Sequence, residues 1–244
     1  MGRRLLAAAG ILCLFALASW GPAIASEAGL GVDWGRPALA PPPLRPRAPA
    51  GPVDAVQGFF WTLAEAVAQA RQEPEPEAFA RAYAYLSPAW RARLPFPRFV
   101  AAWRGLGHLE LLAALPAGSP APGARARRVF VETRSVVPEP DGAAVVYQYG
   151  FFTAEPGPEG WRLSEGTLRR EAFAAAADPA EAARRAAAAE ARILGLPGSP
   201  GPATLRPTQD PRLAEAHVAV GQTSFRIVLY RLVDGGWVPL SATR

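Results

Sequence analysis

The stretch AAVVYQYGFFT, at residues 143–153, decides the fold class of this chain. Its bulky side chains stand at every second position, from Val145 through Tyr147 and Tyr149 to Phe151. Because successive side chains of a β-strand point to opposite faces of the sheet, this alternation predicts a strand with one apolar face. It is the strongest strand signal in the sequence, and its neighbours are expected to pair with it.

Three further segments show weaker alternation: residues 109–115, 128–137 and 161–173. The central strand is separated from its neighbours by residues 138–142 and 155–160, which are rich in proline and glycine. Short turn-forming links of this kind join antiparallel strands. The four segments therefore predict an antiparallel meander, in which Gly166 marks a bulge of the last strand.

Four helices are predicted ahead of this sheet. The first begins at Pro52, and its apolar residues recur at helical spacing: Val53, Val56, Phe60, Leu63 and Val67. A second helix is expected over residues 77–86, and Ser87 is suited to cap a short third helix. Phe99 and Trp103 belong to a fourth. Helices followed by an antiparallel meander indicate an α+β fold.

The C-terminal part of the chain is expected to be a smaller unit. Asp178 and Pro179 are suited to start an alanine-rich helix over residues 180–194, interpreted as a connector or a partner-docking helix. Residues 195–211 are rich in proline and glycine and predict a loop. Three short strands are expected after it: residues 214–220, 224–233 and 237–241. Because this tail is too short for a robust core, we expect it to pack on the main domain or to continue its sheet.

The N-terminus has the layout of a cleavable signal peptide over residues 1–25. Arg3 and Arg4 precede an apolar run of about 16 residues, which is shorter than the ~20 residues that cross a bilayer. Ala23-Ile24-Ala25 then matches the small-x-small pattern that signal peptidase cleaves. Cys13 is not preceded by the small residue of a lipoprotein signal, so it is expected to leave with the signal peptide. We therefore expect a secreted or extracytoplasmic cell-envelope protein without disulfides.

These signals divide the chain into five parts: a signal peptide at 1–25, a proline-rich linker at 26–51, an α+β domain at 52–175, an alanine-rich helix at 176–196 and a C-terminal β-hairpin or meander segment at 197–244. Hydrophobic residues make up 50% of the chain, which is enough for a sizeable core. Without Arg3 and Arg4, 24 basic residues stand against 21 acidic ones, a formal charge of +3. The basic residues are scattered over the chain, so nucleic acid is not expected as a partner.

Residues 52–173 resemble the NTF2-like (SnoaL-type) superfamily. Four groups of residues carry the resemblance: Pro52-Val53-Asp54-Ala55-Val56 with Phe59 and Phe60, residues 83–91, Phe99 with Trp103, and residues 160–166. The resemblance implies a cone, in which helices and a curved sheet enclose an apolar pocket. It implies no single function, because the superfamily contains isomerases, dehydratases, carrier-binding proteins and exported modules.

An enzyme of this fold would need an acid or a base inside the cone. Five residues of the predicted strands qualify by their chemistry: Glu132, Glu165, His108, Tyr147 and Tyr149. A carboxyl group in an apolar pocket has a raised pKa and can act as a base near neutral pH. No family motif aligns with these positions, so no catalytic residue is assigned.

The alternation of the strands ranks these five residues. Glu132 lies between Val131 and Thr133 and is therefore expected to face solvent, and His108 at a strand start is expected to be exposed. Tyr147 and Tyr149 are expected in the core or a pocket wall. Glu165 continues the face of Trp161 and Leu163, which makes it the strongest candidate for a functional acid.

The residues predicted to line a ligand pocket are Phe60, Tyr83, Trp90, Trp103, Tyr147, Tyr149 and Glu165. We expect an exported, non-catalytic module that binds an apolar small molecule or an envelope protein, and its partner could also be a second copy of the chain. The alternatives are a cofactor-independent isomerase, dehydratase or hydrolase with a carboxylate in the cone, and a purely structural envelope protein. No cofactor, metal site or membrane span is expected in the mature chain, because it offers no clustered metal ligands and no second apolar run.

Overall fold

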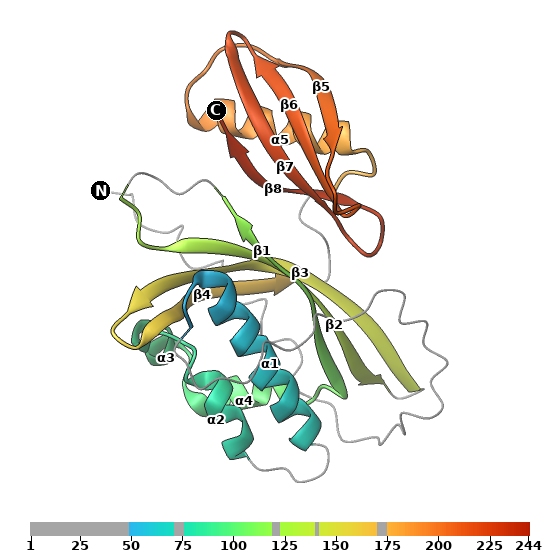
Figure 1. The fold of residues 1–244 in the computed structure, drawn as a ribbon. Helices are drawn as coiled ribbons and strands as arrows, with labels where there is room; N and C mark the ends of the chain where they lie inside the picture. Colours follow the sequence, from blue (N-terminus) through green and yellow to red (C-terminus); the bar gives the residue numbers. More distant parts are fainter. Residues whose placement is uncertain (1–48, 71–75, 119–122, 140–141, 170–174) are drawn as a thin grey trace, which may run out of the picture.

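A computed structural model describes residues 49–70, 76–118, 123–139, 142–169 and 175–244. It contains two four-stranded antiparallel sheets, with a layer of helices on one sheet and a single long helix on the other (Figure 1). The predicted α+β class is therefore confirmed. The predicted signal peptide and nearly all of the predicted linker lie outside the described residues.

The helical layer comes first in the chain, as predicted. It consists of α1 (Pro52–Ala70), the 3-10 helix η3 (Pro76–Phe79), α2 (Ala80–Tyr83), α3 (Pro88–Arg93) and α4 (Phe96–Trp103). The single helix predicted over residues 77–86 is thus replaced by a 3-10 turn and a short α-helix. The predicted cap of α3 is confirmed, because the side chain of Ser87 accepts a hydrogen bond from the backbone N–H of Trp90 at 3.2 Å.

The first sheet is the predicted meander, with strand order β1-β2-β3-β4. Its strands are β1 (His108–Ala117), β2 (Arg127–Glu139), β3 (Gly142–Gly157) and β4 (Gly160–Arg169). The β3–β4 register shifts once, so that Thr153 pairs with Glu165 while Ala154 pairs with Leu163. The bulge of β4 therefore lies at Ser164, two residues before the predicted position at Gly166.

The core between the helices and this sheet is aromatic. Phe59 and Phe60 of α1 are buried, and both rings pack against Phe152 of β3, with ring centroids 6.1 and 5.2 Å apart. The apolar stripe predicted for the first helix supplies Val56, Leu63 and Val67 to the same core. The helical spacing of these residues thus places one face of α1 on the sheet.

The second sheet has strand order β5-β6-β7-β8 and is separate from the first. It follows α5 (Pro179–Ile193), and its strands are β5 (Pro200–Pro207), β6 (Leu213–Val220), β7 (Thr223–Arg231) and β8 (Trp237–Thr243). The loop predicted over residues 195–211 is therefore wrong for β5. Proline is tolerated on edge strands, where a missing N–H costs no ladder hydrogen bond, and β5 is such an edge.

The alanine face of α5 packs on this second sheet. Ala183 and Ala187 are fully buried, in a cluster with Val218, Phe225 and Ile227 of the strands. Small alanine side chains allow the helix to approach the sheet closely. The helix therefore closes the C-terminal unit and does not act as a connector.

The two sheets meet through the face of the first sheet that points away from its helices. Phe130 and Tyr149 of the first sheet form one buried cluster with Tyr230, Leu232 and Leu240 of the C-terminal unit. Two backbone contacts flank the cluster. The N–H of Gly118 donates to the carbonyl of Leu240 at 2.7 Å, and Ala176 pairs with Trp237 as an isolated bridge. The tail thus packs on the main domain, as expected, without continuing its sheet.

None of the helices among the described residues has the length and apolar character needed to cross a bilayer.

The pairing of β3 with β4 yields a test of the fold. A Cβ atom added at Gly150 would lie 1.7 Å from the backbone oxygen of Thr167, whereas one added at Gly105 would meet no atom within 4 Å. Gly150→Ala should therefore lower the free energy of unfolding by about 1–3 kcal/mol or more, because the strands must move apart. Gly105→Ala, the matched control, should change it by less than about 1 kcal/mol. Urea denaturation measures both, and equal effects would contradict the β3–β4 register.

Candidate functional site at the interface of the two sheets

Four of the predicted pocket residues lie in the core between the helices and the first sheet. Phe60 is buried, Trp90 and Tyr83 are half-buried against the same cluster, and Trp103 is 9% exposed. Trp90 packs near Phe152, with ring centroids 6.2 Å apart. These four predicted pocket residues thus lie in or against one hydrophobic core cluster.

The Tyr83 hydroxyl has a structural role in this core. It lies 2.8 Å from the carbonyl oxygen of Leu94 and 3.2 Å from that of Arg91, within reach of the single proton that it can donate. Its ring also packs edge-on against Phe96 at 5.2 Å. Tyr83 therefore holds the turn between α3 and α4.

Tyr147 and Tyr149 lie on the other face of the first sheet. They share that face with Phe151, whereas Phe152 points to the helices. Tyr149 is 2% exposed and Tyr147 is half-buried, and both contact the cluster at the interface of the two sheets. The seven predicted pocket residues are thus divided by the sheet and do not line one pocket.

Glu165 is exposed, so its predicted position beside Trp161 and Leu163 in a pocket is wrong. The physical reason is the bulge at Ser164, which adds one residue between Leu163 and Glu165. An extra residue reverses the alternation of a strand, so that Leu163 is buried while Glu165 faces solvent.

Glu132, which was expected to face solvent, is completely buried at 0% exposure. Its carboxylate bonds to the C-terminal unit through both oxygens. The Tyr230 hydroxyl donates to Oε2 at 2.5 Å, and the backbone N–H of Val233 donates to Oε1 at 2.9 Å. Glu132 thus connects β2 with the end of β7 across the interface.

The burial of Glu132 follows from the second sheet. On β2, Val129 and Val131 face the helices, whereas Phe130 lies in the interface cluster. Glu132 shares the face of Phe130, and the C-terminal unit covers that face. The sequence did carry a signal for this, because Phe130 places an aromatic side chain on the supposed solvent face.

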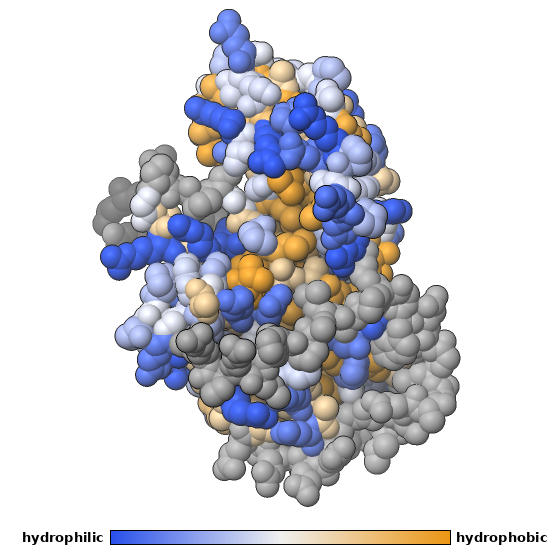
Figure 2. All heavy atoms as spheres, in the orientation of Figure 1, coloured by the Kyte–Doolittle hydropathy of each residue, from blue (hydrophilic) through white to orange (hydrophobic). Residues whose placement is uncertain are grey.

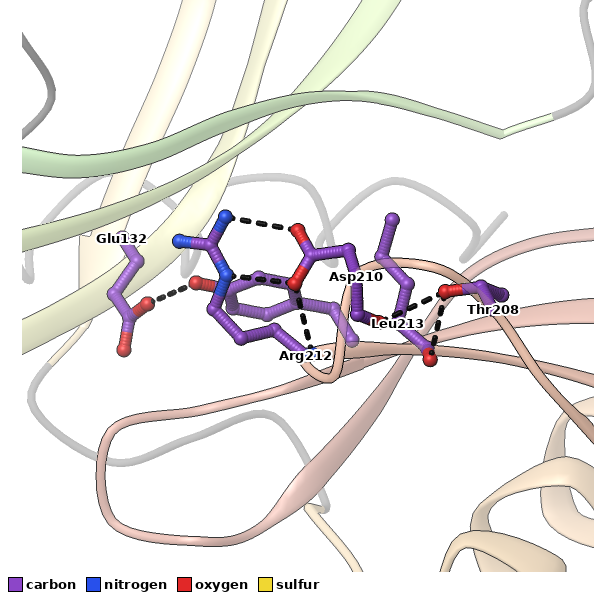
Figure 3. Close-up of polar contacts among 6 residues, drawn as sticks. Glu132, Thr208, Asp210, Arg212 and Leu213 are labelled. Atoms are coloured by element: carbon purple, nitrogen blue, oxygen red, sulfur yellow. Dashed lines mark hydrogen bonds and ion pairs between the residues drawn. The ribbon is translucent and has the colours of Figure 1, made fainter.

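Arg212 adds a positive charge near this carboxylate. It lies in the turn between β5 and β6, and Asp210 holds it by hydrogen bonds from Nε at 3.0 Å and from the second guanidinium nitrogen at 2.8 Å (Figure 3). Hydrogen bonding to Asp210 raises the pKa of Arg212, and the negative charge of Glu132 adds to this effect. Arg212 therefore remains charged and offsets part of the cost of burying Glu132.

Tyr149 is the cross-strand neighbour of Glu132. Burial raises the pKa of its hydroxyl, and the negative charges of Asp234 and Glu132 raise it further. A neutral tyrosine beside two carboxylates is a hydrogen-bond donor and not a base. Tyr149 thus supports the interface in its protonated form.

A second polar group lies on the same face at the start of β1. Glu110 is the cross-strand neighbour of Arg134, and its carboxylate accepts a hydrogen bond from Arg134 Nε at 2.6 Å. The ring of His108 lies 3.2 Å from the same carboxylate and is half-exposed. Arg134 is 2% exposed, and the negative charge of Glu110 balances its positive charge on this face of the sheet.

The structure places all five acid–base candidates on one face of the first sheet, the face opposite to the helices. Glu132, His108, Tyr147 and Tyr149 lie on the face that points away from the helices. Glu165 shares this face, because it pairs with Thr153 while the next residue, Gly166, pairs with Phe152 on the helical face. Sequence reasoning missed the residues that complete this group: Glu110, Arg134, Asp210, Arg212 and Tyr230. These partners come from distant parts of the chain and carry no local motif.

The hydrogen bonds of Glu132 act as a tether that links the first sheet to the C-terminal unit. Both oxygens of Glu132 accept hydrogen bonds from groups of the protein, and the carboxylate has no solvent-exposed surface. A substrate could reach it only if the two sheets separated. Among the residues that the structure describes, no three histidine, cysteine or acidic side chains are grouped as a metal site would need.

Comparison with known proteins assigns no family to the chain. No protein-family model matches it, and no curated protein matches it. Among solved structures, a similar chain is described as "Ntf2 like protein involved in plasmid conjugation". The match covers 78% of this chain and 96% of that one, at 7% identity and a TM-score of 0.25. A likeness this distant supports no functional inference.

The environment of Tyr149 predicts how the protein responds to alkaline pH. Because the folded state raises the pKa of Tyr149, its contribution to stability is complete below about pH 10 and is lost as the pH rises further. In the folded protein, Tyr149→Phe should therefore leave the tyrosinate absorbance unchanged near pH 10, since the signal there comes from the other tyrosines. A smaller absorbance in the variant would contradict a buried, protonated Tyr149.

Proposed function

We propose that this protein is an exported, non-catalytic NTF2-like module that binds a protein partner. The observation that carries the proposal is the environment of Glu132. It is the best-buried carboxylate of the described chain, and both of its oxygens accept hydrogen bonds from the C-terminal unit. A general base must lie within reach of a substrate, and Glu132 has no exposed surface. This environment therefore favours a structural role for this carboxylate over a catalytic one.

The core on the helical side favours a protein partner over a small-molecule ligand. Phe59, Phe60 and Phe152 are at most 4% exposed and pack against one another. Because these side chains fill the space between the helices and the sheet, they occupy the volume that a small-molecule ligand would need. The NTF2-like assignment itself rests on the order of helices and meander and on the residues that carry the resemblance.

The surface that suits a partner is the seam between the two sheets. Leu115, Phe151 and Val228 belong to the interface cluster but are only half-buried. Figure 2 shows hydrophobic side chains at the surface in the middle of the molecule, between more hydrophilic regions above and below. Apolar surface of this kind is typical of protein–protein contact sites.

Export is the second part of the proposal. It rests on the signal peptide predicted for residues 1–25 and on the absence of cysteine from the chain after Ala25. A chain without disulfides must hold its two units together by other means. The tether at Glu132 and the apolar cluster around it provide such means.

Native mass spectrometry of the protein, purified after export without detergent, tests both parts. Cleavage after Ala25 should give the mass of residues 26–244, alone or as a multiple for a homodimer, with no added small molecule. A reproducible additional mass of small-molecule size would contradict the filled core and favour a ligand-binding or catalytic role. A chain that retains residues 1–25 would contradict the predicted cleavage.

A further inference from the structure

One part of the helical layer carries positive charge without acidic neighbours in sequence. Residues 78–109 contain five arginines and no aspartate or glutamate. This differs from the rest of the chain, where the two signs are mixed. Arg81 is paired with Glu65 at 3.2 Å, which leaves four arginines on α3, α4 and the turns beside them: Arg91, Arg93, Arg98 and Arg104.

These four arginines make little contact with the rest of the protein. Arg93, Arg98 and Arg104 are exposed, and Arg91 is half-buried. Within the part of the chain that the structure describes, the only side-chain hydrogen bond of the group joins Arg93 to the carbonyl of Ser164, at 2.9 Å. The guanidinium groups are thus available for a partner outside the molecule.

The turn that carries them is held in place. The Tyr83 hydroxyl lies within hydrogen-bond distance of the carbonyls of Arg91 and Leu94, and the Tyr83 ring contacts Phe96. Leu94 and Phe96 are half-buried, between Arg93 and Arg98. The helices lie on the side of the first sheet opposite to the C-terminal unit, so this turn faces away from the interface (Figure 1).

We propose that the α3–α4 turn docks on the phosphate headgroups of an anionic phospholipid surface. Guanidinium groups bind phosphate through paired hydrogen bonds and are weakly hydrated, which suits them to this contact. Leucine and phenylalanine between the arginines are the residue types that enter the interfacial region of a bilayer. An acidic protein segment would match the charge as well, and the test below distinguishes it from a lipid surface.

The size of the effect can be anticipated. Each arginine close to an anionic leaflet strengthens partitioning about fivefold, so removal of three should weaken it on the order of a hundredfold. The attraction should fall steeply with added salt, because it acts between solvent-exposed charges.

The test is sedimentation of the exported protein with vesicles of phosphatidylcholine alone or of equimolar phosphatidylcholine and phosphatidylglycerol. The wild type should bind only the vesicles that contain phosphatidylglycerol. Arg91→Gln/Arg93→Gln/Arg98→Gln should lose about a hundredfold in partitioning. The control, Arg184→Gln/Arg192→Gln/Arg206→Gln, removes three exposed arginines from the C-terminal unit and should bind as the wild type does.

A third variant tests the position of the contact. Glu165 is an exposed carboxylate one residue beyond Ser164, whose carbonyl accepts the hydrogen bond of Arg93. The side chain of Glu165 points to the face of the sheet opposite to α3, because it is Gly166 that pairs with Phe152 on the helical face. Glu165→Gln should therefore change binding to the anionic vesicles far less than the loss of the three arginines does. Circular dichroism confirms that each variant is folded.

Four results would overturn the proposal. The first is that the wild type binds neither kind of vesicle, and the second is that it binds both kinds equally. The two triple variants could lose the same affinity, which would show an effect of net charge alone. Retention of the wild type on immobilised polyglutamate without binding to anionic vesicles would assign the turn to an acidic protein instead.

Discussion

The arrangement of the two units depends on a buried carboxylate. Glu132 has no exposed surface, and an isolated buried charge would cost several kcal/mol, on the order of the whole stability of a domain. That cost is reduced only while Tyr230 and Val233 donate to its two oxygens and Arg212 stays near. If the C-terminal unit shifted while it still covered Glu132, these partners would be lost together and the charge would stay buried. The carboxylate thus fixes the position of the second sheet on the first more specifically than the apolar cluster around it.

The covering of the first sheet by the C-terminal unit explains why the central strands carry buried apolar side chains on both faces. β2 and β3 supply Val131 and Phe152 to the helical core, and Phe130 and Tyr149 to the interface. A sheet with one solvated face would need only the first set. The buried polar groups on the face away from the helices are paired, as Arg134 is with Glu110 and Glu132 is with Tyr230.

The sequence was sufficient to predict features that depend on local patterns. The alternation at residues 143–153, the cap at Ser87 and the stripe of α1 predicted the order of helices and meander. The sequence was insufficient for residues whose burial or secondary structure depends on a distant segment of the chain. Glu132 alternates with Val131 like any surface residue, and only the second sheet buries it. The exposure of Glu165 depends on one bulge residue, and β5 forms in a proline-rich segment because β6 offers it an edge.

The most direct test of the central claim is a double-mutant cycle on Glu132 and Tyr230, followed by urea denaturation. Glu132→Gln keeps the side-chain volume and removes the charge, and Tyr230→Phe removes the donor. The account predicts that the two changes are not additive, with a coupling of about 1 kcal/mol, because a hydrogen bond to a charged group is stronger than one to a neutral group. The same cycle with Tyr83→Phe, on the helical side, should show no coupling. Additive effects for Glu132 and Tyr230 would contradict the tether.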